Sequence, residues 1–212
     1  DEVYGAVMHG RSKEGDGFAP RSPYAASKAG GEHMARAYQV SHGLPLIVTR
    51  GANTYGPYHY PEKLIPVLIT NAIDDQPLPL YGDGTAVRDY LHVEDHCRAI
   101  DLALHEAEPG NVYNVGTGAE WSGNSVADLV CELLGKPQRL IEHVQDRKGH
   151  DYRYALDTQK IRTELGWRPQ VPFAEGMAET VRWFREREDW WRPLKNGAYW
   201  EYYRRNYQPL PR

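Results

Sequence analysis

The chain alternates short apolar runs with longer segments in which apolar residues recur every three or four positions. Residues 44–49 are almost all apolar, which is typical of a buried parallel strand. Segments 63–74 and 173–187 carry apolar side chains at helical spacing, which predicts helices with one buried face. Strands that alternate with helices along a chain indicate an α/β fold. We therefore expect a layered α/β protein.

The remaining elements follow from the same reasoning. Residues 3–4 are expected to end a strand at Gly5. Further strands are expected at 78–81, 87–93, 111–115 and 140–144, and further helices at 23–41, 94–105, 125–134 and 158–165. Residues 50–57 are expected to form a loop at the carboxyl end of the strand before them, where ligands bind in α/β sheets. The Trp- and Tyr-rich tail, 190–207, is expected to pack, with Tyr207 as an exception.

Composition narrows the function. The 212 residues have a formal net charge of −4 and a pI near 6.1, so no general basic surface indicates nucleic-acid binding. No run of about 18 apolar residues predicts a membrane span. Cys97 and Cys131 lie in expected helices without metal-ligand spacing, which suits a reducing cytoplasm. The chain opens without Met at what resembles the tail of a strand, so we expect a fragment.

One helix start carries candidate chemistry. Ser22 can cap the helix and Pro23 suits its first position. Tyr24 and Lys28 then lie one turn apart on the same face. An ammonium near a phenol favours the phenolate, which is a usable base. The pattern alone is weak, because an exposed Tyr and Lys on an alanine-rich helix would look the same.

A dinucleotide-binding fingerprint is missing. Gly82 with Gly84, and Gly116 with Gly118, lack a third glycine at the offset of G-x-G-x-x-G. These residues therefore do not provide the usual pyrophosphate seat at a helix N-terminus.

Several stretches together resemble dTDP-glucose 4,6-dehydratase, an extended short-chain dehydrogenase/reductase (a lyase) of deoxysugar biosynthesis. They are, in order, Asp1-Glu2-Val3-Tyr4-Gly5, Tyr24-x-x-x-Lys28, Asn53-Thr54-Tyr55-Gly56-Pro57-Tyr58, Pro61-Glu62-Lys63-Leu64-Ile65-Pro66, Arg88-Asp89-Tyr90, Tyr113-Asn114-Val115-Gly116 and Gly149-His150-Asp151. The likeness covers nearly the whole chain but lacks the family's N-terminal glycine-rich part.

The resemblance implies the C-terminal part of a Rossmann-type parallel sheet plus a smaller mixed α/β domain that binds the nucleotide sugar. Residues 1–57 would be the remainder of the NAD-binding domain, with 94–116 and 173–187 folding back onto it. Residues 58–93, 117–172 and 188–212 would form the substrate domain.

The resemblance also implies the catalytic residues. Tyr24 would take the proton of the sugar 4-hydroxyl while hydride passes to NAD, and Lys28 would hold the nicotinamide ribose. Glu2 would remove the C5 proton and Asp1 would protonate the departing 6-hydroxyl. Neighbouring side chains on a strand point to opposite faces, so we expect the backbone to bend or end there. The family's Thr before this pair is absent, and Thr54 replaces its second Asn.

Substrate contacts are implied by position. They are Asn53, Glu62, Lys63, Leu64, Pro79, Tyr81, Arg88, Asn114, Arg147, His150 and Tyr207. Arginine suits a diphosphate because its planar fork donates two parallel hydrogen bonds. The alternative for each Arg is a solvated surface charge. Lys148 replaces the family's usual Pro. We treat His59, His92 and His96 as structural and expect no metal, because no second ligand lies at metal spacing.

Two other functions stay open. One is a related nucleotide-sugar epimerase or decarboxylase, which generally lacks the Asp1-Glu2 pair. The other is an inactive fragment that binds nucleotide sugar or only dimerises. The family is commonly a homodimer built on the Tyr-Lys helix, and the small residues Ala25, Ala29 and Gly30 are compatible with such packing. Gly31 is also small, and we expect a cofactor or helix to approach closely here.

Overall fold

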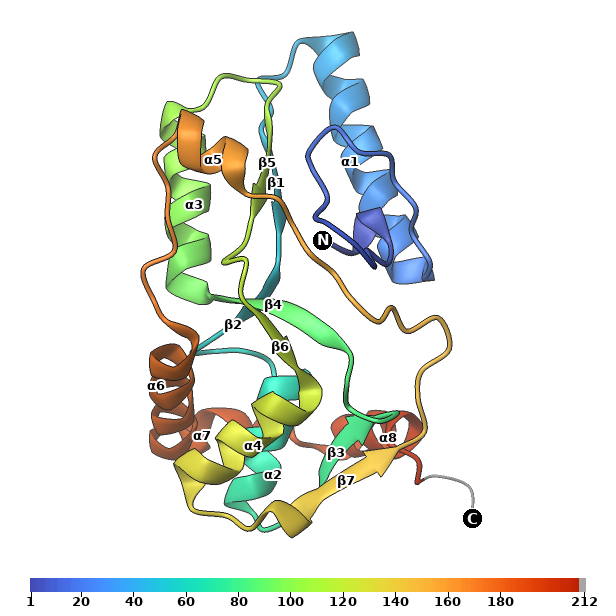
Figure 1. The fold of residues 1–212 in the computed structure, drawn as a ribbon, viewed down its shortest axis with the longest axis vertical. Helices are drawn as coiled ribbons and strands as arrows, with labels where there is room; N and C mark the ends of the chain where they lie inside the picture. Colours follow the sequence, from blue (N-terminus) through green and yellow to red (C-terminus); the bar gives the residue numbers. More distant parts are fainter. Residues whose placement is uncertain (210–212) are drawn as a thin grey trace. The chain divides into compact units, whose positions relative to one another are not determined.

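The computed structural model describes residues 1–209, which form two compact units. Unit 1 consists of Asp1–Thr54, Val87–Glu120 and Asp151–Val171. Unit 2 consists of Tyr55–Ala86, Trp121–His150 and Pro172–Arg212, of which the structure describes the part up to residue 209. The chain therefore crosses repeatedly between the units (Figure 1).

The helices and strands follow the α/β pattern, which confirms the predicted fold class. The helices are η1 (Glu2–Tyr4), α1 (Pro23–His42), α2 (Leu64–Ile73), α3 (Val93–Glu106), α4 (Gly123–Leu134), η2 (Gln138–Leu140), α5 (Gln159–Glu164), α6 (Phe173–Glu186), α7 (Glu188–Trp191), η3 (Arg192–Leu194) and α8 (Gly197–Asn206). The strands are β1 (Val48–Gly51), β2 (Asn53–Tyr55), β3 (Leu78–Tyr81), β4 (Val87–His92), β5 (Val112–Val115), β6 (Glu120–Ser122) and β7 (Ile141–Val144).

Unit 1 is built on the parallel pair β1–β5, in which Val48 lies opposite Val112. Helices α1 and α3 lie on either side of this pair (Figure 1). One apolar core belongs to this unit, and η1, α1, β4, α3, β5 and α5 each contribute buried side chains to it. Its most buried members are Leu91, Ala99, Val115 and Ile161. The core fixes the carboxyl ends of β1 and β5, where we look for a site.

Helix α1 begins and ends as its sequence predicts. The Ser22 hydroxyl accepts the Ala25 N–H at 3.0 Å, and Pro23 occupies the first turn. Gly43 closes the helix in the left-handed conformation, with φ 65°. These end signals place Tyr24 in the first turn of the helix.

Unit 2 contains the second parallel pair, β3–β7, in which Leu78 lies opposite Ile141. Helix α2 is apolar all round and almost wholly buried, with Leu68 and Ile69 at 0% exposure. It packs against β3, α4 and α6, whose buried side chains include Phe184 and Met177. The unit therefore has a core of its own.

Three sequence expectations were wrong in local structure. Residues 3–4 belong to the 3₁₀ helix η1, not to a strand. The strand expected at 44–49 begins at Val48, because Gly43 and Pro45 lie just before it. The expected loop 50–57 contains the end of β1 and all of β2, and the tail forms α7, η3 and α8.

Strands β2, β4 and β6 form a short sheet in that order. The compact units also divide the chain differently from the expected domains, since 151–171 falls in unit 1 and 173–187 in unit 2. Assignment of the segments to a cofactor domain and a substrate domain stays a prediction. Within the described part of the chain, no helix has the length and apolarity needed to cross a membrane.

Candidate active site

The acidic pair Asp1-Glu2 lies on a single 3₁₀ turn. The N–H groups of Tyr4 and Gly5 donate to the carbonyls of Asp1 and Glu2 at 3.2 and 3.1 Å. A 3₁₀ helix has three residues per turn, so consecutive side chains diverge by about 120° and do not point to opposite faces. The turn supplies the bend that we expected at this acidic pair.

This turn lies at the carboxyl end of β1. The Asp1 nitrogen donates to the carbonyl of Gly51, the last residue of that strand, at 3.1 Å. The Asp1 Oδ2 atom is buried without a hydrogen-bond partner among residues 1–209. A buried acceptor without a donor is costly unless a ligand satisfies it. The acidic pair therefore lies where an α/β sheet binds ligands.

Tyr24 and Lys28 share a face of α1, as predicted. The Tyr24 side chain is 59% exposed, and the Lys28 ammonium lies 5.9 Å from the centre of its ring. An exposed phenol beside an ammonium fits the nicotinamide ribose of a dinucleotide. The pyrophosphate seat is absent from this sequence, so these residues fit only that part of NAD.

A buried arginine joins the elements that carry both pairs. Arg50, 8% exposed at the end of β1, donates from Nε to Glu32 of α1 at 2.9 Å and from Nη1 to the Glu14 carbonyl at 2.9 Å. Its Nη1 also donates to the Tyr4 hydroxyl of η1. Sequence reasoning passed over this residue, because nothing in the local pattern distinguishes a buried Arg from a solvated one.

The two candidate asparagines differ. Asn114 is 0% exposed, accepts from the Tyr4 hydroxyl at 2.8 Å and donates to the Ser12 carbonyl at 2.9 Å. Its amide is thus turned toward the protein. The Asn53 Oδ1 atom is buried without a hydrogen-bond partner among residues 1–209. Asn53 is therefore the better supported of the two as a ligand contact, and both roles stay predictions.

Arg88 is held by backbone and by an aromatic ring. It donates to the carbonyls of Val87 at 2.7 Å and Asp151 at 2.8 Å, and lies 4.3 Å from the ring centre of Tyr154. The Tyr154 hydroxyl donates to the buried Asp151 carboxylate at 2.9 Å. Asp151 also forms an ion pair at 3.0 Å with Arg21, which precedes the cap of α1. This cluster connects the predicted diphosphate arginine to the residue that precedes α1.

In unit 2, four predicted contacts gather around one ring. Tyr81 stacks on Tyr207 with 5.1 Å between ring centres and 20° between planes. The Arg147 guanidinium lies 4.7 Å from the Tyr81 ring centre, and His150 meets that ring edge-on at 6.1 Å. Burial raises the pKa of both tyrosine hydroxyls, which therefore stay neutral donors. Cations beside flat aromatic surfaces suit a nucleotide diphosphate.

The other predicted contacts of unit 2 lie on two elements. Lys63 occupies the N-cap of α2, directly before Leu64, and forms an ion pair with Glu62 at 3.1 Å. The helix N-terminus favours anions through its free N–H groups. Pro79 is buried on β3 two residues before Tyr81, on the same side of the strand. Their roles stay predictions.

The histidines occupy packed positions. His96 lies against Gly51, and its Nδ1 is 2.7 Å from the Thr54 hydroxyl. His59 is mostly buried, and burial lowers its pKa to about 4. Among residues 1–209, no group of three or more His, Cys, Asp or Glu side chains is placed to hold a metal ion.

Known proteins match this chain over most of its length. The dTDP-glucose 4,6-dehydratase of Streptomyces niveus is 50% identical over 196 residues, covering 92% of this chain and 58% of the relative. That of Actinoplanes sp. is 49% identical over 191 residues, covering 90% of this chain and 60% of the relative. The chain spans about 60% of the length of these relatives.

Solved structures agree with the fold. The dTDP-glucose 4,6-dehydratase of Streptomyces venezuelae, determined with NAD bound, has a TM-score of 0.90 and 50% identity, covering 92% of this chain and 60% of that one. The UDP-glucose 4-epimerase of Thermus thermophilus, in complex with NAD, has a TM-score of 0.82 and 36% identity, covering 88% and 61%. The likeness to dTDP-glucose 4,6-dehydratases is confirmed, and so is the Rossmann-type α/β class.

A family model gives the same result. The model described as GDP-mannose 4,6 dehydratase matches residues 1–180. This chain belongs to the family that this model describes, GDP-mannose 4,6 dehydratase.

Proposed function

We propose that the protein carries out NAD-dependent dehydration of dTDP-glucose to dTDP-4-keto-6-deoxyglucose, as a hydro-lyase. One observation carries the proposal: the Asp1-Glu2 pair lies on a 3₁₀ turn at the carboxyl end of β1, in the same compact unit as Tyr24 and Lys28. Oxidation at C4 needs Tyr24 and Lys28, and loss of water needs the Asp1-Glu2 pair. Unit 1 therefore holds the residues for both steps.

Tyr24 acts in oxidation. Its exposed side chain is the general base that accepts the proton of the sugar 4-hydroxyl, and the Lys28 ammonium lies on the same helix face. The chemistry that NAD supplies when bound is removal of hydride from C4 and its return to C6.

Asp1 and Glu2 act in elimination. The C4 ketone acidifies the C5 proton, which Glu2 accepts, while Asp1 donates a proton to the 6-hydroxyl. The C5–H and C6–O bonds break, a C5–C6 double bond forms and water leaves. Two carboxyl groups with different environments can divide the roles of acid and base. Both residues are partly exposed, but only Asp1 has a carboxylate oxygen, Oδ2, that is buried without a hydrogen-bond partner among residues 1–209.

Unit 2 supports recognition of the nucleotide diphosphate. The stacked pair Tyr81 and Tyr207 offers a wall for a base, with Arg147 and His150 beside it. In unit 1, Arg88 is fixed on Tyr154, which supports a diphosphate contact there.

The experiment is incubation of the purified protein with dTDP-glucose and NAD, with the sugar product followed by NMR. The expected product has a C6 methyl group and a C4 ketone. Epimerisation at C4 without a methyl signal would favour the epimerase alternative, to which the likeness with UDP-glucose 4-epimerase gives some weight.

We further propose a homodimer formed through α1. Met34 and Tyr38, one turn apart on this helix, are 59% and 49% exposed, and Val40 is 78% exposed. Ala25 and Ala29, which sequence analysis considered for this packing, are buried within unit 1 instead. A Cβ at Gly30 or Gly31 would meet no atom within 4 Å, so no contact within the described chain accounts for them. Sedimentation velocity with Met34→Glu and Tyr38→Glu would test the dimer.

A cytoplasmic location stays a prediction.

A further inference from the structure

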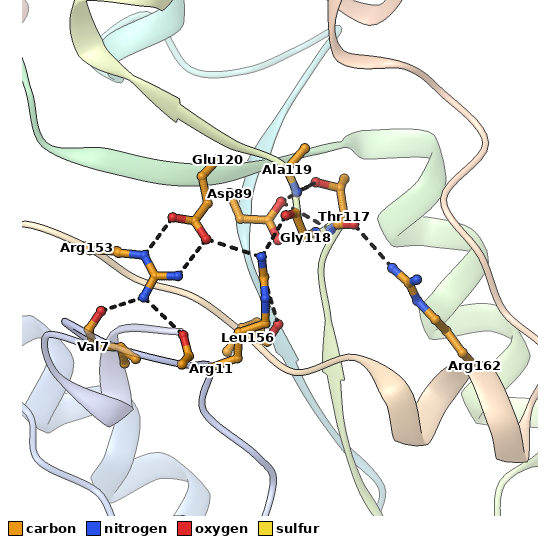
Figure 2. A network of polar contacts seen from close by, with 11 residues as sticks. Val7, Arg11, Asp89, Thr117, Gly118, Ala119, Glu120, Arg153, Leu156 and Arg162 are labelled. Atoms are coloured by element: carbon orange, nitrogen blue, oxygen red, sulfur yellow. Dashed lines mark hydrogen bonds and ion pairs between the residues drawn. The ribbon is translucent and has the colours of Figure 1, made fainter.

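A polar network outside the predicted site surrounds Arg153 (Figure 2). Its guanidinium donates from Nε and Nη2 to the two carboxylate oxygens of Glu120, at 2.6 and 2.7 Å. The remaining nitrogen, Nη1, donates to the carbonyls of Val7 at 2.7 Å and Gly10 at 3.0 Å. The Arg153 side chain thus joins Glu120, the first residue of β6, to the loop that follows η1.

The loop after η1 is bound to the segment of Arg153 along its length. The Val7 N–H donates to the Arg153 carbonyl at 3.0 Å, so this residue is bound on both sides. Farther along, the Ser12 N–H donates to the Ala155 carbonyl at 2.9 Å. Of the loop residues bound to the segment of Arg153, Val7 is the nearest to Glu2 in the sequence. Between them is Gly5, whose φ of +71° makes the turn out of η1.

The chemistry of this attachment requires an arginine. Arg153 and Glu120 are 17% and 22% exposed, and hydrogen bonding to Arg153 lowers the pKa of the Glu120 carboxyl. The carboxylate therefore stays charged and fixes the plane of the guanidinium through two parallel bonds. A lysine has one point of charge and cannot hold the carboxylate and both carbonyls in this geometry.

We infer that Arg153, oriented by Glu120, is a positioning residue for the elimination pair Asp1-Glu2. The inference rests on the proposed dehydration. Tyr24 is set by the caps of α1, which do not involve the network, whereas the backbone of the acidic pair continues directly into the bound loop. Loosening the loop should impair proton removal at C5 more than oxidation at C4.

Arg11 gives a matched control within the same network (Figure 2). Arg11 lies in the loop itself, contacts Glu120 at 3.2 Å and donates to the carbonyls of Gly118 at 2.9 Å and Leu156 at 3.4 Å, but the structure gives it no bond to Val7 or Gly10. Arg11→Gln removes a positive charge and the attachment of residue 11, far from Glu2 along the loop, but leaves the Val7 and Gly10 carbonyls bound to Arg153. Arg153→Gln removes the same charge and releases them.

The test compares turnover of dTDP-glucose with that of substrate carrying deuterium at C5. For Arg153→Gln we expect kcat to fall about 10- to 100-fold and the C5 isotope effect to rise, because misplacement of a catalytic group by about 1 Å can cost that much. The kcat and the C5 isotope effect of Glu120→Gln should lie between those of Arg153→Gln and those of the unsubstituted protein. Arg11→Gln should have the kcat and the isotope effect of the unsubstituted protein. If Arg153→Gln does not fold, Arg153→Lys takes its place with the same expectation.

A fall in kcat without a larger C5 isotope effect, or an equal effect in Arg11→Gln, would overturn the inference. Hydrogen exchange of the loop amides gives a readout that needs no substrate: Arg153→Gln should speed exchange at residues 5–12 but not in α1. Unchanged exchange would also overturn it. If the unsubstituted protein makes no methyl product, the proposed function fails, and with it the elimination role, while faster loop exchange would still establish the attachment by Arg153.

Discussion

The Arg88 guanidinium lies 4.3 Å from the ring centre of Tyr154, and the hydroxyl of the same tyrosine donates to Asp151 at 2.9 Å. Burial, with the neighbouring Asp151 and Glu2 charges, raises the pKa of the Tyr154 hydroxyl, which therefore stays a donor at any physiological pH. The ring face of Tyr154 thus packs against the guanidinium of Arg88, the candidate diphosphate arginine. The hydroxyl of Tyr154 gives the buried Asp151 carboxylate a hydrogen-bond donor.

Tyr154→Phe should lower the free energy of unfolding by about 1–2 kcal/mol, because the buried Asp151 carboxylate loses a donor while the ring under Arg88 remains. Urea unfolding measures this. Tyr152→Phe is the matched control, since Tyr152 is 47% exposed and should change stability by less than about 0.5 kcal/mol. Equal losses in both variants would show that the Asp151 bond contributes little.

Gly51→Ala should destabilise unit 1 by about 1–3 kcal/mol, because the new Cβ would lie 2.7 Å from the His96 Nε2 atom and closer still to Cε1. The ring cannot move away without losing its contact with the Thr54 hydroxyl. In a His96→Ala background the same substitution should cost about 1–2 kcal/mol less, which a double-mutant cycle measures. Additive effects would contradict the steric account.

Tyr24→Phe should reduce kcat for dTDP-glucose about 10²- to 10⁴-fold, the range for loss of a general base. Its stability should change by less than about 0.5 kcal/mol, because the side chain is 59% exposed. Steady-state kinetics and thermal unfolding of one preparation check both numbers. A comparable loss from Tyr38→Phe, an exposed tyrosine on the same helix, would mean that the effect is not specific to the site.

Sequence reasoning succeeds where the signal is local. The ends of α1 follow from Ser22, Pro23 and Gly43, and the buried strand β3 and helix α2 follow from their apolar patterns. The position of Tyr24 relative to Lys28 follows directly, because helical spacing leaves no freedom.

The rest depends on contacts distant in sequence. The 3₁₀ turn at Asp1 and Glu2 contains Val3 and Tyr4. These two residue types favour a strand when only the sequence is considered, but backbone hydrogen bonds close the turn. Arg50 and Arg153 look like solvated charges until the fold places Glu32 and Glu120 beside them. Asn114 matches a family contact by position, but its amide is satisfied by Tyr4 and Ser12.

The last prediction concerns His59, whose pKa is lowered to about 4, first by burial and then by the Lys63 charge. In the unfolded chain its pKa is near 6.5. Between these values the unfolded state binds more protons, so stability rises with pH across the window. The contribution of His59 is therefore complete above about pH 6.5 and is lost as the pH falls toward 4, by on the order of 2–3 kcal/mol.

His59→Gln should remove this part of the pH dependence. From pH 7 to pH 4, the unfolding free energy of the variant should therefore fall less than that of the unsubstituted protein. Chemical denaturation at a series of pH values measures it, and acidic residues that titrate in the same range cancel in the difference. Lys63→Met removes the nearby charge but leaves His59 buried. It should slightly narrow the pH range between the pKa of His59 in the folded protein and its pKa in the unfolded chain. Because the Nδ1 atom of His59 has no hydrogen-bond partner among residues 1–209, burial must account for most of the effect, and a parallel pH profile for His59→Gln would refute that cause.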